Sequence, residues 1–472
     1  MTTHVDLIVL GTGSAAQSVA YPCREAGWSV AVVDYQPYGG TCALRGCDPK
    51  KVLVGVSELV DWSRRMQGKG VSAPGLALTW TDLIRFKHTF VDDVPESTDE
   101  SFKSAGIATL HGRARFVDRT TIQVGEETLV GRHVVIATGA RHAPLGIPGE
   151  EYLTTSTQFL DLAALPRRVA FVGGGYIAME FAHVAARAGV QVHILHRGDR
   201  PLEQFDADLV NQLVETTRDL GVDIQVRTTV EAIEKRGEEL VVHVRAGDET
   251  RKVPADLVVH AAGRVPEIDD LDLAAAGVAR IEKGGVSVND YLQSVSNPAV
   301  YAAGDAVDSG GFPLTPVAGM QGGIVAANLL EGNTRTPSYA GIPSVVFTTP
   351  PLAAVGLDEA GARAQGLHFT TRHEDTSGWY SSRRVALAHT GFKTLVEEGT
   401  GRILGAHLLG LHAEEVINIF GLAIRTNLRA SDLTAMIYAY PTSASDISYM
   451  VYVFGKHFQD HHGNHIPAHL ML

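Results

Sequence analysis

The chain has 472 residues, of which 45% are hydrophobic and 20% are charged, and its formal net charge is −13 at pH 7. This length suggests about three domains, and the composition excludes a fibrous or disordered protein. The acidic balance argues against nucleic acid or an anionic membrane as a partner, and no apolar run reaches the roughly 18 residues that a membrane span needs. Three cysteines exclude a disulfide scaffold and suit a reducing compartment. With no basic leader before the first apolar run, we expect a cytoplasmic protein.

Residues 5–34 have the pattern of a strand, a glycine-rich turn, a helix and a second strand. Gly11, Gly13 and Ala16 have G-x-G-x-x-A spacing, in which the first glycine permits a tight turn and the second lets the backbone approach a pyrophosphate. The alanine lets the helix and strand pack closely. Asp34 ends the second strand, where a carboxylate can accept hydrogen bonds from a ribose diol. These features together indicate a dinucleotide-binding unit rather than a glycine-rich turn alone.

The same pattern returns from residue 168, with Gly173, Gly175 and Ala178 at the same spacing. The second strand here is followed by Arg197 and Arg200 instead of an acid. A carboxylate would repel a 2′-phosphate, whereas an arginine can hold it through forked, charge-assisted hydrogen bonds. We therefore predict NADPH in preference to NADH, although the same charges also suit a solvated strand end.

Cys42 and Cys47 lie five residues apart in GGTCALRGCDPKK, residues 39–51. Five residues of regular helix rise about 7.5 Å, which exceeds the usual Cα separation of a disulfide. A bridge between them therefore needs a break in the helix, which Gly46 would permit. A zinc site would need further ligands, and Cys23 has no cysteine or histidine near it in the sequence, so we predict a buried Cys23 and no metal site.

Residues 39–51 resemble the signature of the class I pyridine nucleotide-disulfide oxidoreductases, the family of glutathione reductase, dihydrolipoamide dehydrogenase and mercuric reductase. The segment matches GGTC-x-x-x-GC-x-P-x-K position by position. Further segments resemble other parts of the family, at residues 134–149, 260–271, 300–322 and 345–357.

The resemblance implies an α/β fold with two Rossmann-like nucleotide-binding domains, one for FAD and one for NAD(P), and a C-terminal α+β dimerisation domain. The FAD domain is expected to be discontinuous, because the NAD(P) domain is inserted within it. The expected bounds are 1–147 and 268–336 for the FAD domain, 148–267 for the NAD(P) domain and 337–472 for the interface domain. The protein would be a homodimer whose active site is shared across the interface.

The resemblance also assigns roles to residues. Cys47 would lie against the flavin as the charge-transfer thiolate, and Cys42 would attack the substrate. Lys51 matches the lysine beside flavin N5 and Glu180 its acidic partner, with Lys50 as a competitor; a cation there stabilises reduced flavin and keeps the neighbouring thiol ionised. Further FAD contacts are expected at Gly40, Thr41, Ala114, Thr138, Gly139, Asp305, Leu314 and Thr315, with Asp305 on the ribityl chain, and Gly263 is expected near the nicotinamide nucleotide.

The chain departs from the family pattern near its C-terminal end. Disulfide reductases of the family carry H-P-x-x-x-E, whose histidine, held by the glutamate, moves protons between thiols. Here AYPTSASDISY places Tyr440 at the histidine position and Ser445 at the glutamate position, with Asp446 one place later. A phenol with a pKa near 10 is a poor base at neutral pH, although it can donate a hydrogen bond.

Three functions remain open. In the first, electrons pass from NADPH through FAD and the Cys42–Cys47 disulfide to a small disulfide whose leaving thiol is acidic and departs without a proton. In the second, the acceptor is a quinone, a carbanion or a protein thiol; mercuric ion is disfavoured because the C-terminal region has no second cysteine pair. The third is a redox-sensing flavoprotein with little turnover. We expect the first.

Several other residues have two interpretations. Trp379 and Tyr380 either line a substrate pocket or pack within the fold, and Glu414 and Glu415 are expected at the dimer interface with His412. Clustered histidines can bind transition metals, but we expect an exposed terminal segment instead. These histidines are His457, His461, His462, His465 and His469.

Overall fold

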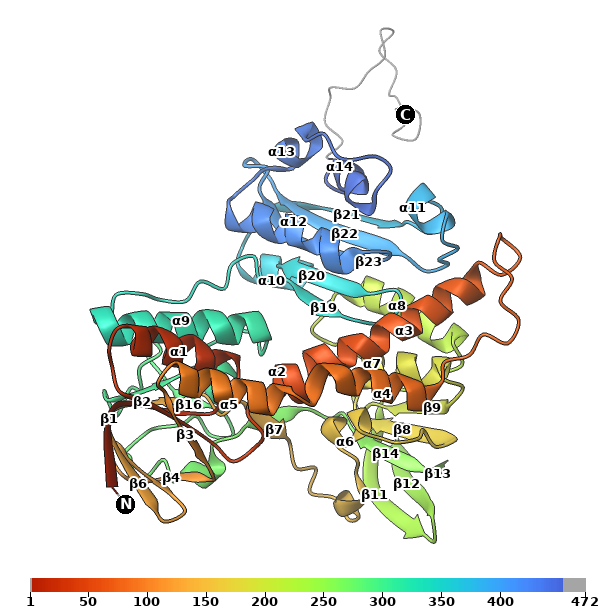
Figure 1. The fold of residues 1–472 in the computed structure, drawn as a ribbon. Coiled ribbons are helices and arrows are strands. Elements are labelled where there is room, and N and C mark those ends of the chain that lie inside the picture. The colour runs from red at the N-terminus through yellow and green to blue at the C-terminus, as the bar shows by residue number, and fades with distance from the viewer. Residues whose placement is uncertain (1, 453–472) are drawn as a thin grey trace.

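The computed structural model describes residues 2–452, and an N-terminal sheet of seven strands forms its first part (Figure 1). The strand order is β3-β2-β1-β6-β5-β4, with β17 also paired to β6, and only β4 and β5 run antiparallel to their neighbours. Alternate residues of β1 face opposite sides: Leu7 and Val9 pack against helices α1 and α9, while Ile8 and Leu10 belong to the core on the other face. The strands are β1 (Thr2–Leu10), β2 (Val30–Asp34), β3 (Ala108–His111), β4 (Ala114–Asp118), β5 (Thr121–Val124), β6 (Glu127–Ile136) and β17 (Val300–Ala302). The two helices are α1 (Ser14–Glu25) and α9 (Thr315–Glu331).

A second, wholly parallel sheet has the order β10-β9-β8-β14. An antiparallel sheet of three strands is inserted in the chain between β10 and β14. Helix α7 repeats the place of α1, because it follows the first strand of its sheet through a glycine-rich turn. The elements are β8 (Arg168–Val172), α7 (Tyr176–Arg187), β9 (Gln191–Leu195), α8 (Ala207–Asp219), β10 (Asp223–Gln225), β11 (Thr228–Arg236), β12 (Glu239–Ala246), β13 (Glu249–Ala255) and β14 (Leu257–His260).

The two chain crossings between these parts lie side by side. β7 (Ala140–His142) leads into the second sheet and β15 (Arg264–Pro266) leads out of it, and the two pair antiparallel. Both crossings are therefore fixed to each other by backbone hydrogen bonds.

The C-terminal sheet is antiparallel, with the order β19-β20-β23-β22-β21. The amphipathic helix α12 lies along it (Figure 1) and buries Val416, Ile417 and Phe420 against the strands. The elements are β19 (Ser344–Val346), β20 (Leu352–Gly356), α10 (Glu359–Ala364), β21 (Phe369–Asp375), α11 (Tyr380–Arg383), β22 (Gly391–Glu397), β23 (Ile403–Leu409), α12 (Ala413–Arg425), α13 (Ala430–Ala435), η4 (Ser443–Asp446) and α14 (Ile447–Met450).

The remaining elements connect these sheets. The long helix α3 runs along the boundary between the nucleotide-binding parts and the C-terminal sheet (Figure 1). These connecting elements are α2 (Gly40–Arg45), α3 (Cys47–Arg65), α4 (Trp80–Val91), α5 (Val94–Ser104), η1 (Glu150–Tyr152), α6 (Ser156–Leu160), η2 (Asp269–Leu271), β16 (Val286–Ser287), η3 (Gly304–Ala306) and β18 (Val307–Asp308). The expected fold class, with two Rossmann-like parts and a C-terminal α+β part, is confirmed.

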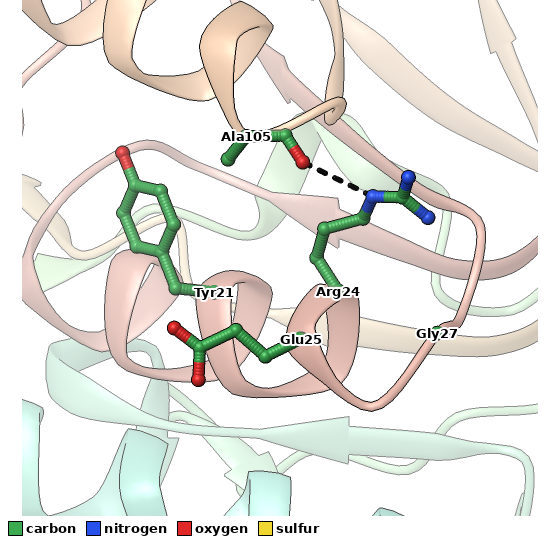
Figure 2. A pocket seen from close by; sticks show the side chains of 5 residues that line it. All are labelled: Tyr21, Arg24, Glu25, Gly27 and Ala105. Atoms are coloured by element: carbon green, nitrogen blue, oxygen red, sulfur yellow. Dashed lines mark hydrogen bonds between the residues drawn. The ribbon is translucent and has the colours of Figure 1, made fainter.

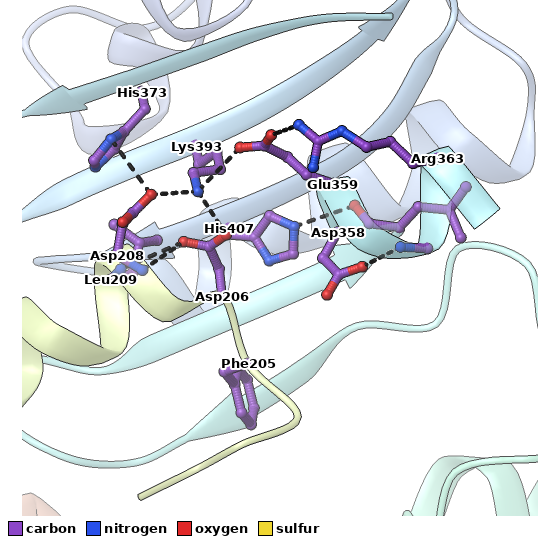
Figure 3. A network of polar contacts seen from close by, with 12 residues as sticks. Phe205, Asp206, Asp208, Leu209, Asp358, Glu359, Arg363, His373, Lys393 and His407 are labelled. Atoms are coloured by element: carbon purple, nitrogen blue, oxygen red, sulfur yellow. Dashed lines mark hydrogen bonds and ion pairs between the residues drawn. The ribbon is translucent and has the colours of Figure 1, made fainter. Parts of the chain in front are cut away.

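A buried ionic network joins the second nucleotide-binding part to the C-terminal sheet (Figure 3). Lys393 of β22 reaches Asp206 at 2.8 Å and Asp208 at 2.5 Å, both at the start of α8, and Glu359 of α10 at 3.3 Å. Only 5% of the Lys393 side chain is exposed. Because a buried ammonium needs compensating charge, the network holds α8 against β22.

Candidate active site

The two glycine-rich turns have the same geometry. A Cβ at Gly11 would lie 2.3 Å from the carbonyl oxygen of Ala137, and one at Gly173 would lie 2.2 Å from that of Ala261. Both glycines have φ near +111°, at +111° and +112°, which only glycine adopts readily. Ala16 and Ala178 of the following helices are fully buried against their sheets. Each turn thus lets a helix begin directly above its first strand, as a dinucleotide cradle requires.

The first cradle is lined by backbone and by short polar side chains. A Cβ at Gly40 would lie 2.4 Å from Cα of Gly13, so two bare backbone segments face each other there. Asp34 at the end of β2 accepts hydrogen bonds from Thr12 Oγ1 at 2.7 Å and from the amide of Gln36 at 3.0 Å. These bonds fix the carboxylate at the position expected to meet a ribose.

The other predicted FAD residues come from five separate segments. Thr138 and Gly139 follow β6, and Oγ1 of Thr138 is buried without a hydrogen-bond partner among residues 2–452. Asp305 lies in η3, where burial raises the pKa of its carboxyl group while Arg264, 3.4 Å away, opposes this. Leu314 and Thr315 begin α9, Thr41 lies in α2, and Ala114 begins β4. The orphaned hydroxyl and the bare backbone cradle fit a large polar cofactor such as FAD.

The two cysteines sit on either side of a break between helices. α2 ends at Arg45 and α3 begins at Cys47, and Gly46 between them has φ −139° and ψ −114°, far from helical values. A Cβ at Gly46 would lie 2.8 Å from the carbonyl oxygen of Thr41, so this close approach requires glycine. The departure from regular helix that a Cys42–Cys47 bridge needs is present. Both cysteines are free thiols in the structure, as is the buried Cys23.

The thiol pair is electrostatically asymmetric. The hydrogen bond that Cys42 donates to Cys47 raises the pKa of Cys42 and lowers that of Cys47 to about 6, although burial of Cys47 opposes the lowering. The hydroxyl of Thr315, 3.4 Å from Cys47 Sγ, and the charge of Lys50 favour the Cys47 thiolate further. These influences favour the thiolate at Cys47 and the thiol at Cys42.

The lysine beside Glu180 is Lys50, and the predicted pairing with Lys51 is wrong. Lys50 Nζ lies 2.7 Å from Glu180 Oε1, whereas Lys51 Nζ lies 3.7 Å from Glu58. Consecutive helical residues point about 100° apart, and the break at Gly46 sets the phase of α3 so that Lys50 faces α7. Glu180 also accepts a hydrogen bond from the amide of Phe347 at 2.9 Å. The sequence motif located both lysines but did not show which of them points towards Glu180.

Phe347, which follows β19 of the C-terminal part, was not predicted. Lys50 lies 4.3 Å and Lys51 4.5 Å from the centre of its ring, within range of a cation–π interaction. In the sequence, the only signals for this role of Phe347 are its aromatic ring and its position one residue after β19. Residues from all three parts thus meet at Lys50 and Glu180.

In the second nucleotide-binding part the two predicted arginines differ. Arg197 is exposed and makes no hydrogen bond or ion pair within residues 2–452. Arg200 instead donates from Nη2 to the carbonyl oxygens of Glu203 at 2.9 Å and Phe205 at 2.8 Å, so it holds the loop after β9. Glu203 lies 3.4 Å from His196 in the same loop. Gly175 and Gly263 both have open space where a Cβ would stand, which leaves room for a nucleotide.

Tyr440 has no acidic partner among the described residues. Its side chain is 66% exposed. Ser445 is turned inward and donates to the carbonyl oxygen of Thr442 at 2.6 Å. Burial raises the pKa of Asp446, whose neighbours are Ser381 and Arg384 rather than Tyr440. Within residues 2–452, therefore, no histidine–carboxylate pair is rebuilt beside Tyr440.

The remaining candidates make no hydrogen bond to either redox cysteine within residues 2–452. Trp379 packs on Phe392 and Tyr449, whereas Tyr380 is 61% exposed. Glu414 raises the pKa of Glu58 on α3, which burial already raises. Between residues 2 and 452 no cluster of histidine, cysteine and acidic side chains has metal-binding geometry, and the histidines from His457 onward lie outside this range.

A pocket of about 420 Å³ lies at the C-terminal end of α1, far along the helix from the glycine-rich turn. Figure 2 shows that Arg24 in its wall donates to the carbonyl oxygen of Ala105, at 3.1 Å. Arg24 also donates to the carbonyl oxygen of Trp28, at 3.1 Å. The guanidinium is thus committed to the backbone, and this pocket is no part of the site. Separately, no helix within residues 2–452 has the length and apolar character to cross a membrane.

Comparison with known proteins agrees with this geometry. Residues 5–322 match the pyridine nucleotide-disulphide oxidoreductase family, and residues 342–451 match the dimerisation domain of that family. The chain is 33% identical to a glutathione reductase of Nostoc sp. over 94% of its own length and 99% of the relative's. It is 32% identical to a mercuric reductase of Staphylococcus aureus, over 96% of this chain and 82% of that protein.

Among solved structures, the Cu(II) complex of the HOCl-induced flavoprotein disulfide reductase RclA from Escherichia coli superposes with a TM-score of 0.85. It is 28% identical in sequence, and the match covers 95% of this chain and 99% of RclA. The chain therefore belongs to the pyridine nucleotide-disulphide oxidoreductase family, as an FAD-dependent NAD(P)H oxidoreductase that acts on a disulfide.

Proposed function

We propose that this enzyme uses NADPH to reduce a low-molecular-weight disulfide whose leaving thiol is acidic, with Cys42 as the attacking group. The observation that carries the proposal is Tyr440, which occupies the position of the family's proton-transferring histidine and has no carboxylate partner among residues 2–452. An aliphatic thiolate is a poor leaving group unless it is protonated, whereas an acidic thiol departs as the thiolate. A site that lacks an imidazole therefore favours the second kind of substrate.

The electron balance requires no further proton source for such a substrate. FAD, when bound, supplies the capacity to take up a hydride equivalent and release its electron pair to a disulfide. Reduction of the Cys42–Cys47 bond by one hydride equivalent yields one thiolate and one thiol, and the pKa difference assigns the thiolate to Cys47.

The substrate step then proceeds by two exchanges. Cys42, giving its proton to Cys47 as it attacks, forms a mixed disulfide with one half of the substrate and releases the other half as an acidic thiolate. Cys47 next attacks Cys42, which restores the protein disulfide and releases the second half with the retained proton. The sum is NADPH plus one disulfide giving NADP⁺, one thiol and one thiolate.

We further propose that the active site is completed across a homodimer. The segment that carries Tyr440 exposes large apolar side chains, with Ile437 at 95% and Met436 at 51% exposure. Exposed apolar patches on a folded chain indicate an interaction surface. This segment belongs to the matched dimerisation domain, which supports the proposal. In the proposed dimer, Tyr440 orients a substrate at the partner's Cys42 by donating a hydrogen bond.

The preference for NADPH rests on Arg197. Its guanidinium is exposed near the end of β9 and is not used by another group in residues 2–452, so it is available for the 2′-phosphate. Arg200 supports the loop from within through its two backbone hydrogen bonds.

The test is a series of symmetrical disulfides with graded leaving-thiol pKa, from bis(2-nitrobenzoate) and dipyridyl disulfides to glutathione disulfide. We expect kcat/KM with NADPH to fall steadily as the leaving-thiol pKa rises. Tyr440→His should flatten this dependence by raising the rate with glutathione disulfide, since a placed acid contributes about 10²-fold. Tyr380→His is the matched control, because Tyr380 is similarly exposed, at 61% against 66%, and should change nothing. Rates independent of leaving-thiol pKa in the wild type would contradict the proposal.

A further inference from the structure

Arg45 lies between the two redox cysteines, at the end of α2. The side chain is only partly exposed, and burial lowers the pKa of its guanidinium. No hydrogen bond or ion pair connects this guanidinium to any residue between 2 and 452. A guanidinium carries five N–H donors, and removing it from water without acceptors is costly. The position therefore calls for an acceptor that the described chain does not supply.

The nearby carboxylates are already engaged by other donors. The carboxylates that interact most strongly with the charge of Arg45 are those of Asp34 and Glu267. Asp34 is held by a hydroxyl and an amide, as described above, and Glu267 accepts a hydrogen bond from the phenol of Tyr35. Neither approaches the Arg45 guanidinium within ion-pair distance. Their negative charge stabilises the charged guanidinium of Arg45, but neither carboxylate accepts a hydrogen bond from its N–H groups.

The same region must receive the phosphates of FAD. Asp34 marks the ribose end of the cradle, and Cys47 marks the flavin end, so the pyrophosphate lies between them, where the backbones of Gly13 and Gly40 approach each other. Asp34, Glu267 and Asp305 surround this region with negative charge. Cations that offset this negative charge would stabilise a pyrophosphate dianion there, in addition to the backbone N–H groups of the glycine-rich turn.

Two arginines lie near these carboxylates. Arg264 is paired with Asp305 at 3.4 Å and donates to the carbonyl oxygen of Ala140. Arg45 has Arg264 among its charged neighbours and has its donors unused. We propose that Arg45 binds the pyrophosphate of FAD with its guanidinium, so that the segment carrying both redox cysteines is itself anchored to the cofactor.

A forked guanidinium suits this task better than an ammonium. Two N–H groups can contact two phosphate oxygens at once, with geometry that lysine cannot reproduce. The expected order of FAD affinity is therefore wild type, then Arg45→Lys, then Arg45→Gln.

The experiment measures FAD binding to the full chain directly. Holoenzyme is diluted to nanomolar concentration, and the dissociation constant is obtained from the fluorescence of released FAD at low and high NaCl. Arg45→Gln should raise the dissociation constant about tenfold or more, as loss of a charge-assisted hydrogen bond predicts. Its salt dependence should also be weaker than that of the wild type, because one screened charge interaction has been removed.

Arg113→Gln is the matched control. Arg113 lies in the same neighbourhood, 4.0 Å over the ring of Tyr35, but it has a partner within the chain, Asp270 at 2.7 Å. Its FAD affinity should stay within about twofold of the wild type. The melting temperature of FAD-saturated Arg45→Gln, followed by tryptophan fluorescence, separates lost affinity from lost fold. An unchanged dissociation constant for Arg45→Gln, an equal loss in Arg113→Gln, or unfolding of Arg45→Gln under FAD saturation would each overturn the proposal.

Discussion

Lys393 is buried and Lys50 is largely buried, with 5% and 12% of their side chains exposed, but their electrostatic surroundings differ. Lys50 meets one carboxylate, that of Glu180, and the face of Phe347. Lys393 meets three carboxylates, and although burial lowers its pKa, hydrogen bonds to Asp206 and Asp208 raise the pKa overall. The charge of Lys50 is balanced by a single carboxylate, and it also lowers the pKa of Cys47. The charge of Lys393 is instead surrounded by three carboxylates, and these ion pairs join two parts of the fold.

The largest effect is expected when Lys50 is removed. Lys50→Met should lower kcat by about 10²-fold, as the loss of one preorganised electrostatic group does, and should also lower the melting temperature, because buried Glu180 then lacks its cation. Steady-state turnover with NADPH and a bis(2-nitrobenzoate) disulfide measures this. Lys51→Met is the control, because Lys51 is 43% exposed and lies 3.7 Å from Glu58. Equal losses in the two variants would restore Lys51 to the site.

Removal of Lys393 should act on stability instead. Lys393→Met leaves three carboxylates together without their cation, and we expect a loss of about 3 kcal/mol, at the lower end for a broken buried pair because Asp208 is half exposed. Urea unfolding followed by far-UV circular dichroism would measure it, and adding Asp208→Asn should recover part of the loss. Turnover per folded molecule should stay at the wild-type level. A large fall in kcat without destabilisation would break the distinction between the two lysines.

The pH dependence of the cysteine pair sharpens the comparison further. The pKa of Cys47 is lowered to about 6, so the thiolate is present above pH 6 and is lost as the pH falls below it. Lys50→Met removes one of the lowering influences and should raise the apparent pKa by about one unit, or roughly 1.4 kcal/mol. Titration of the long-wavelength absorbance of the reduced enzyme gives this value. Lys393→Met should leave it unchanged.

Arg197 differs from both lysines, because it is exposed and has no ion-pair partner within residues 2–452. Arg197→Gln should raise KM for NADPH several-fold to about tenfold while leaving KM for NADH nearly unchanged. Arg227→Gln is a suitable control, because Arg227 is also exposed but pairs with Asp199 at 2.6 Å. If KM for both nucleotides rises equally, Arg197 does not contact the 2′-phosphate.

The sequence predicted the features that depend on local spacing. The turns at Gly11 and Gly173 follow from steric rules that involve only a few neighbouring residues, and so does the need for a helix break at Gly46. The fold class follows from the same repeats together with the family resemblance.

Features that depend on the relative placement of elements were not predictable. The choice between Lys50 and Lys51 depends on the phase of α3, which is set by the geometry at Gly46. The inward turn of Arg200 depends on how the loop after β9 folds back on itself, with its guanidinium bonded to the carbonyl oxygen of Phe205. Phe347 reaches the site only because β19 of the C-terminal part lies against α7.

The most direct test of the account is anaerobic reduction by one equivalent of NADPH at pH 7.5. We predict a long-wavelength absorbance band from contact between the Cys47 thiolate and oxidised flavin, in the wild type and in Lys393→Met alike, and a much weaker band in Lys50→Met. Absence of the band from wild-type enzyme that retains its FAD would contradict the central claim, since it would mean that the Cys42–Cys47 pair does not receive electrons from the flavin.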